Sequence, residues 1–162
     1  MKSDIQIAQE AKMEPIVKIA EKLNCPIAII DKRRTGPNVA EVMNIIGDIK
    51  GKTCIIVDDI CDTAGTLTAA ANALVANGAK EVYAACTHGL LSGPAVSRIV
   101  DSPIKEMIIT NTVRLPEEKR HEKIVQLSVG TLLGHGILKI LSDEPLSGLF
   151  TYNYDKEKRE LL

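Results

Sequence analysis

The chain has 162 residues and a mass of 17.5 kDa, which fits one domain or one domain with a small appendage. Hydrophobic residues make up 45% and charged residues 25%, a globular composition that excludes a disordered or collagen-like protein. Lysine and arginine number 20 against 21 aspartates and glutamates, and aromatic residues are only 2%. With no basic excess and few rings for base stacking, we expect no nucleic-acid partner.

The same composition argues against a membrane or secreted protein. The longest uncharged stretch, residues 127–138, is too short and too polar to cross a bilayer, and the first residues carry charges without an apolar signal core. No C-x-x-C spacing occurs among the cysteines, which are Cys25, Cys54, Cys61 and Cys86. We therefore expect a cytoplasmic protein with no membrane partner, whose reduced cysteines act as small hydrophobic residues.

The first third of the chain has a mixed pattern. Apolar residues at helical spacing predict a helix from about 15 to 24, and the residues before it have a weaker pattern. A short buried strand is predicted at 26–30, and an exposed basic loop follows at 31–38. Residues 39–47 have a β-like composition, and 48–52 form a polar turn.

From residue 53 onward, apolar strands alternate with amphipathic helices. Strands are predicted at 53–57, 81–87, 106–110 and 124–128, and helices at about 67–76, after Gly93-Pro94, and at about 130–141. The charged segment 114–123 is predicted to be a solvated loop, and 151–162 a polar tail. This alternation predicts an α/β fold, a mostly parallel sheet with helices on both faces and ligands at the carboxyl ends of its strands.

The most informative string is VDDICDTAGT, residues 57–66. An apolar strand is expected to deliver Asp58 and Asp59 to the sheet edge, where they could accept the hydroxyls of a ribose or hold a hydrated Mg²⁺. The turn that follows has the composition of a phosphate cradle: Gly65 allows unusual dihedral angles, and the helix start supplies amides and a positive field. Hydroxyl donors come from Thr63 and Thr66. The alternative is that Asp62 and Thr63 only cap a helix.

This string resembles the loop of the type I phosphoribosyltransferase fold, in the form found in ribose-phosphate pyrophosphokinases (phosphoribosyl pyrophosphate synthetases). Further strings are similar to the same family: AIIDKRR, PNVAEVMNIIGDIKGK, ANALVANGAKEVYAACTHGLLSGPAVSRI, TNT, RLPEEK and SGLF. The resemblance extends over about residues 19–150 and is to the carboxyl-terminal domain of the family. It implies pyrophosphoryl transfer from ATP to ribose 5-phosphate with Mg²⁺, giving phosphoribosyl pyrophosphate and AMP.

The resemblance also implies roles for particular residues. Lys32 and Arg34 fall on the family's catalytic loop, where they would offset charge on the transferring group. The ribose 5-phosphate site would comprise Asp58, Asp59, Asp62, Thr63, Ala64, Gly65 and Thr66, with Asp58 and Asp59 as weaker metal candidates. A positioning role is expected for His88, and Ser147 and Phe150 match a regulatory phosphate or nucleotide segment at a subunit interface, although Pro145 and Gly148 depart from that pattern.

Residues 1–18 differ from the family. The S-P-D-x-G-G loop that binds pyrophosphate and metal has no counterpart, since no glycine precedes Gly36. We therefore expect a divergent segment at 1–18, a phosphoribosyltransferase-like domain at 19–150, and little turnover of ATP by this chain alone. Exposed strand edges favour a homo-oligomer or a partner chain that completes the site. Two alternatives remain: a non-catalytic ribose 5-phosphate-binding subunit, and a base-specific phosphoribosyltransferase.

Overall fold

A computed structural model describes residues 25–33 and 42–150 of the chain. The predicted helix at 15–24, the segment 1–18 and the tail at 151–162 lie outside these residues. The chain divides into two compact units, residues 1–50 and 51–162, and each is described by itself.

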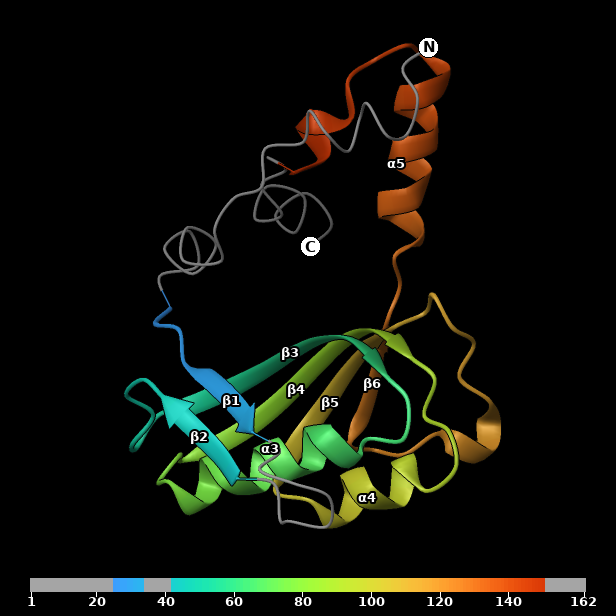
Figure 1. The fold of residues 1–162 in the computed structure, drawn as a ribbon. Helices are drawn as coiled ribbons and strands as arrows, with labels where there is room; N and C mark the ends of the chain where they lie inside the picture. The colour runs from blue at the N-terminus through green and yellow to red at the C-terminus, as the bar shows by residue number, and fades with distance from the viewer. Residues whose placement is uncertain (1–24, 34–41, 151–162) are drawn as a thin grey trace, which may run out of the picture. The chain divides into compact units, whose positions relative to one another are not determined.

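The first unit contains an antiparallel pair of strands, β1 (Ile29–Arg33) and β2 (Val42–Ile46), drawn in blue and cyan in Figure 1. The pairing runs from Ile29 opposite Ile46 to Arg33 opposite Val42. The prediction of a buried strand at 26–30 is wrong in two respects: the strand continues through Arg33, into the predicted basic loop, and Ile29 is 55% exposed. Two strands alone form too thin a layer to bury their side chains.

The second unit contains a four-stranded sheet with the order β3-β4-β5-β6, and every neighbouring pair is parallel. Its strands are β3 (Thr53–Cys61), β4 (Glu81–Gly89), β5 (Ile104–Thr110) and β6 (Ile124–Leu127). Its helices are α3 (Gly65–Ala76), α4 (Ala95–Asp101) and α5 (Gly130–Leu141), with short 3-10 turns η1 (Glu117–Lys119) and η2 (Leu146–Phe150). The predicted parallel α/β sheet is confirmed.

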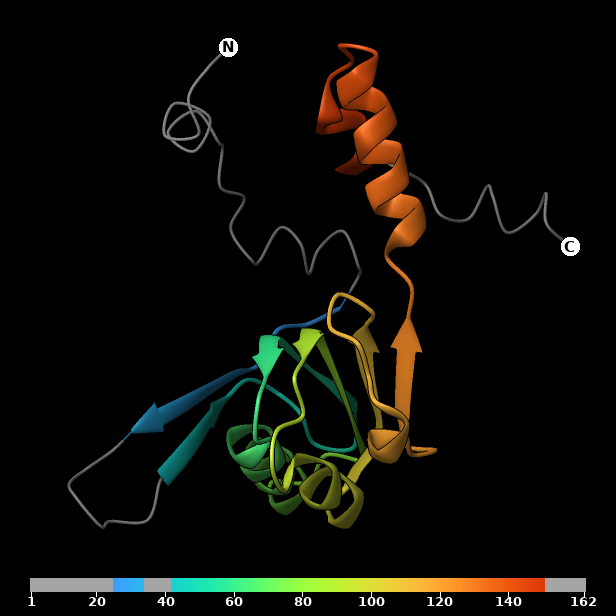
Figure 2. The same cartoon turned by 90° about the vertical axis from the view of Figure 1, so that its right-hand side faces the viewer.

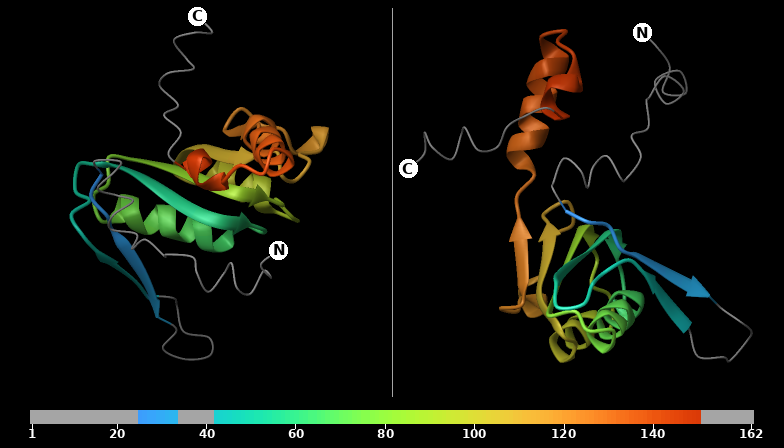
Figure 3. Two further views of the ribbon diagram at one scale, coloured as in Figure 1. Left: turned by 90° about the horizontal axis from the view of Figure 1, so that it is seen from above. Right: turned by 90° about the vertical axis from the view of Figure 1, so that its left-hand side faces the viewer.

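The core of this unit lies between the sheet and two helices. In the views of Figures 1 and 2, α3 and α4 lie side by side under one face of the sheet. The fully buried side chains include Val82, Ala84, Ile99, Ile104, Met107 and Ile109. On the other face, Ile55 and Val57 of β3 are 64% and 78% exposed. Among the described residues, helices therefore cover one face of the sheet (Figure 3).

The last helix has the predicted bounds. The 3-10 turn η2 lies against α5. A Cβ added at Gly136 of α5 would come within 3.7 Å of Leu149 of η2. Several apolar side chains of α5 remain exposed, among them Leu133, Ile137 and Leu141. None of the helices in the described residues is long and apolar enough to cross a membrane.

Candidate functional site

Asp58 and Asp59 lie within β3, because the strand continues to Cys61. The predicted strand end at residue 57 is therefore wrong, although both acids lie in the carboxyl-terminal half of the strand. Each carboxylate accepts the amide of the next residue: Asp59 donates to Asp58 Oδ1 at 2.9 Å, and Ile60 donates to Asp59 Oδ1 at 2.8 Å. Both side chains are exposed, so their remaining oxygen lone pairs can accept hydroxyls of a ligand.

The loop after β3 is held by backbone hydrogen bonds from the segment that follows β4. The amides of Leu90 and Leu91 donate to the Cys61 carbonyl at 3.0 and 3.2 Å, and the amide of Ser92 donates to the Asp62 carbonyl at 2.8 Å. A trans peptide unit directs its C=O and its N–H to opposite sides. The amides of Asp62 and Thr63, which follow these two carbonyls, therefore point away from residues 90–92.

The next carbonyl of the loop is held by a side chain. Arg98 of α4 donates from Nη1 to the Thr63 carbonyl at 3.0 Å. Sequence reasoning missed Arg98, although the string SGPAVSRI that contains it was part of the resemblance. The signal that could have found it is a cation in a short helix that follows the carboxyl end of a neighbouring parallel strand.

The turn into α3 uses an unexpected residue. Ala64 has the left-handed conformation, with φ 59° and ψ 6°, and is buried. The prediction that Gly65 takes the unusual dihedral angles is therefore wrong, since Gly65 is the first residue of the helix and its φ is not positive. The Ala64 carbonyl accepts both the amide and the hydroxyl of Thr68, each at 2.9 Å. These bonds fix the peptide that follows Ala64.

The alternative that Asp62 and Thr63 only cap the helix finds no support, because α3 has no side-chain cap hydrogen bond. Both side chains are exposed. The first amides of a helix have no partner within it, so the start of α3 can donate to an anion. A Cβ added at Gly65 would come within 3.4 Å of Arg98 Nη1 and 3.9 Å of Thr63 Oγ1, so a guanidinium and a hydroxyl lie close to that position.

Two buried thiols lie near this loop. Cys61 and Cys86 are 4% and 5% exposed. A hydrogen bond with Cys86, followed by burial, raises the pKa of Cys61, and the same bond lowers the pKa of Cys86. Burial also raises the pKa of the half-buried Cys54. Cys61 therefore stays a protonated thiol at neutral pH, which agrees with the expectation that the cysteines act as small hydrophobic residues.

His88 lies inside β4, at its carboxyl end, although the sequence placed it after the strand. Its Nδ1 is 2.8 Å from Thr112 Oγ1. The hydroxyls of Thr110 and Thr112 each lie within donating distance of the Thr87 carbonyl, at 2.7 and 3.0 Å. This network connects the carboxyl ends of β4 and β5.

The other predicted site residues belong to other elements of the chain. Lys32 lies in β1 of the first unit, where the backbone alone is described, and Arg34 lies outside the described residues. Ser147 is an exposed residue of η2, and the side chain of Phe150 lies outside the described part. The described residues contain no cluster of three or more potential metal ligands.

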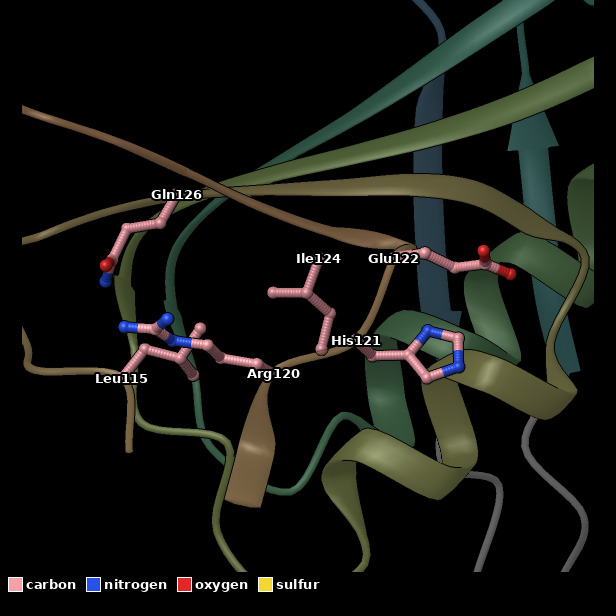
Figure 4. A pocket seen from close by; sticks show the side chains of 6 residues that line it. All are labelled: Leu115, Arg120, His121, Glu122, Ile124 and Gln126. Carbon is pink, nitrogen blue, oxygen red and sulfur yellow. The ribbon is translucent and has the colours of Figure 1, made fainter. Parts of the chain in front are cut away.

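A separate pocket of about 490 Å³ opens beside β6 (Figure 4). It is lined by Leu115, Arg120, His121, Glu122, Ile124 and Gln126. Two of its polar groups have partners in the protein: His121 Nδ1 accepts the amide of Lys123 at 3.1 Å, and Gln126 donates to the Val113 carbonyl at 3.2 Å. None of the predicted site residues lines it.

Comparisons with known proteins identify the family of this chain. A family model described as the phosphoribosyl synthetase-associated domain matches residues 10–151, which is most of the chain. The chain belongs to this family. The family resemblance inferred from the loop is therefore confirmed.

Relatives named ribose-phosphate pyrophosphokinase are highly similar to this chain. Ribose-phosphate pyrophosphokinase of Bacillus subtilis (strain 168) is 63% identical over 134 residues, covering 83% of this chain and 42% of that protein. The protein of the same name from Corynebacterium ammoniagenes is 60% identical over 133 residues, covering 82% of this chain and 42% of that protein. This chain thus spans about two fifths of the length of these relatives.

A solved structure supports the fold. The crystal structure of phosphoribosylpyrophosphate synthetase from Mycobacterium smegmatis is similar with a TM-score of 0.70 and 40% sequence identity. The similarity covers 78% of this chain and 40% of that one. The α/β fold predicted from the sequence is that of this synthetase.

Proposed function

We propose that this chain carries the ribose 5-phosphate half of a ribose-phosphate pyrophosphokinase site. The observation that carries the proposal is that residues 90–92 hold the carbonyls of Cys61 and Asp62, which directs the amides of Asp62 and Thr63 to the opposite side of the loop. Together with the start of α3, these amides offer donors suited to a phosphate. The names and identities of the relatives agree with it.

In this proposal, two sets of residues bind two parts of ribose 5-phosphate. Residues 62–66 hold the 5-phosphate, while Asp58 and Asp59 accept the ribose hydroxyls and so orient the sugar. The anomeric hydroxyl then attacks the β-phosphorus of ATP, and AMP leaves. Positioning and charge stabilisation supply most of the rate acceleration in transfers of this kind.

Lys32 and Arg34 act at the transferring group in this proposal. Lys32 belongs to β1 and Arg34 to the segment between β1 and β2. Both would offset the negative charge that develops during transfer. Loss of one such group costs about 10²- to 10³-fold in rate.

The acids of β3 fit Mg²⁺ when it is shared with a substrate. Mg²⁺ prefers oxygen ligands and is commonly held by one or two carboxylates together with substrate phosphates. Asp58 and Asp59 offer exposed carboxylates that could share such an ion with a substrate phosphate. When bound, Mg²⁺ would supply positive charge to the phosphates.

His88 positions the sugar end of the site in this proposal. When both threonine hydroxyls donate to the Thr87 carbonyl, Thr112 Oγ1 accepts from His88 Nδ1, and Nε2 remains an acceptor for a ligand hydroxyl. Ser147 and Phe150 of η2 remain a prediction for a regulatory phosphate or nucleotide site.

The ATP half of the site lacks a counterpart in this sequence, because no S-P-D-x-G-G loop is present. We therefore propose that these 162 residues bind ribose 5-phosphate but turn over ATP weakly or not at all. In-line transfer requires both substrates to be held within reacting distance. A second chain that supplies the missing groups, or a second copy of this one, would complete the site.

Two measurements test the proposal. Calorimetric titration with ribose 5-phosphate should show binding that weakens at least about tenfold in Asp58→Asn and Asp59→Asn, since each loses a charged acceptor. Asp101→Asn, which neutralises an exposed acid of α4, is the matched control. Absence of binding by the wild-type chain would refute the proposal.

The second measurement is ³¹P NMR of the chain with Mg-ATP and ribose 5-phosphate, without added base. We expect no AMP and no new pyrophosphate-ester signals. Their appearance would show that the half-site interpretation is wrong and that residues of this chain replace the missing loop.

A further inference from the structure

The face of the four-stranded sheet opposite α3 and α4 is covered by no helix of the described residues. It carries one apolar residue from each strand, and these are neighbours in the strand register: Val57, Ala85, Ile108 and Val125. Neighbours in register point to the same side of a sheet, and so do residues two apart along a strand. Ile55 and its register neighbour Tyr83 therefore extend the same surface. We call these six residues the open face.

The open face is unusual for a parallel sheet. Ile55 and Val57 are exposed, and the other four residues are half-buried. Parallel sheets normally have both faces covered, and a contiguous exposed apolar patch marks an interaction surface. We therefore expect another element to lie on the open face.

Helix α5 carries an apolar stripe that is exposed as well. Leu133 and Ile137 are four residues apart, and Ile140 and Leu141 complete the same side of the helix, so the spacing is that of a buried helix face. Each of these four side chains is more than half exposed. Among the described elements, η2 is the one that packs against α5 to more than a marginal extent. The apolar stripe thus has no cover in the described part of the chain.

A short, fixed connection keeps α5 off the open face of its own sheet. Ser128 and Val129 join β6 to α5, and Asn111 holds both. The Asn111 side chain accepts the Val129 amide at 2.9 Å and donates to Ser128 Oγ at 3.3 Å, while its backbone amide donates to the Leu127 carbonyl at 2.9 Å. In Figures 1 and 2, α5 lies beyond the carboxyl end of β6 and not over the sheet. To reach its own open face, the helix would have to break these bonds.

The apolar stripe fits the open face in length and charge. A helix of 12 residues is about 18 Å long and a strand of nine residues about 30 Å, so α5 fits within the length of β3. None of the six residues of the open face is charged. Lys139, the cation of α5, forms an ion pair with Glu144 at 2.8 Å. Packing of the two surfaces would therefore bury no unpaired charge.

We propose that this chain forms a symmetric dimer in which the apolar stripe of each copy packs on the open face of the other. A second copy is the occupant because the chain itself carries the complementary surface and holds it away from its own sheet. Two copies that exchange the same element bury both surfaces of both chains. The proposal goes beyond the proposed function and does not depend on ribose 5-phosphate binding.

Sedimentation equilibrium of the full chain tests the dimer. We expect a mass twice the 17.5 kDa of one chain. Ile55→Glu places a charge on the open face and Ile137→Lys places one on the apolar stripe, each twice in a symmetric dimer, so each should raise the dimer Kd at least about 100-fold. Val75→Glu is the matched control, because Val75 is an exposed apolar residue of α3, which packs on the covered face of the sheet. Its Kd should equal that of the wild type.

Circular dichroism checks the fold of each variant. If Ile137→Lys does not fold, Ile137→Ala tests the same contact, because it keeps a good helix former and removes most of the apolar side chain. The dimer Kd of Ile137→Ala should rise at least about tenfold.

An equimolar mixture of Ile55→Glu and Ile137→Lys distinguishes this exchange from other dimers. In the mixed dimer, the unchanged stripe of one chain meets the unchanged open face of the other, and the second contact pairs a glutamate with a lysine. The mixture should therefore dimerise at least about tenfold more tightly than either variant alone.

The remaining outcomes overturn the proposal in different ways. A monomeric wild type would exclude the dimer. If Ile55→Glu dissociates the dimer and the Ile137 variants do not, another element covers the open face and the role of α5 is wrong. If neither surface matters for the dimer, or if the mixture dimerises no more tightly than the separate variants, the apolar stripe and the open face do not meet.

Discussion

The substitution Gly65→Ala tests whether glycine is needed at this position for ligand binding although it is not needed for folding. Glycine is not needed here for the backbone, because the φ of Gly65 is not positive. It is not needed for packing either, because the added Cβ would meet Arg98 Nη1 at 3.4 Å and Thr63 Oγ1 at 3.9 Å, which are ordinary contacts. A methyl group at this position would nevertheless lie beside two groups suited to a phosphate.

The expected effect on stability is small and favourable. Gly→Ala at a compatible position stabilises a protein by about 0.4–1 kcal/mol, mainly by restricting the unfolded chain. For a chain of this size the melting temperature should rise by about 1–4 °C. Binding of ribose 5-phosphate should weaken at least about tenfold, or 1.4 kcal/mol, because the methyl group occupies space next to the donors.

The matched control is Gly134→Ala in α5, where an added Cβ meets nothing within 4 Å. It should raise the melting temperature similarly and leave binding unchanged. Differential scanning calorimetry and calorimetric titration measure the two quantities on the same samples. Unaltered ribose 5-phosphate binding by Gly65→Ala, in a wild type that binds, would refute the reasoning.

Two further predictions concern packing and thiol chemistry. Gly89→Ala would place a Cβ 2.9 Å from Ile109 Cγ2, against a fully buried side chain, and should cost about 1–3 kcal/mol of unfolding free energy in urea titrations; an unchanged midpoint would contradict this. With a colorimetric disulfide reagent at pH 8, exposed Cys25 should react first and Cys54 more slowly, since burial raises the pKa of its thiol. The buried Cys61 and Cys86 should react only as the protein unfolds, and their prompt reaction in the native state would contradict the burial argument.

Elements from residue 53 to 141 could be predicted because the periodicity of apolar residues reports which face is buried. The ends of strands were less predictable. Both β3 and β4 continue past their apolar residues, through Asp58 and Asp59 in one and His88 in the other. Backbone ladders do not depend on side-chain polarity, so a polar residue in the sequence need not end a strand.

The candidate site could also be located from the sequence, but its conformation could not. The residue types of 58–66 predict phosphate and ribose binding, and the loop lies between β3 and α3 as expected. The left-handed residue is Ala64 and not Gly65, because the partners of its flanking peptides, Arg98 and Thr68, determine its conformation. Intrinsic preference favours the glycine, and tertiary contacts override it.

The phosphate loop is thus shaped by a second segment as much as by its own residues. Leu91, which donates to the Cys61 carbonyl, is also left-handed at φ 50° and is fully buried. Two strained non-glycine residues, each of which costs about 1–3 kcal/mol, therefore lie on opposite sides of one hydrogen-bond network. Such strain persists only where the network fixes both segments together. It follows that the string DTAGT alone would not reproduce this loop conformation on another scaffold, and that residues 90–98 shape the proposed phosphate site although none of them needs to contact a ligand.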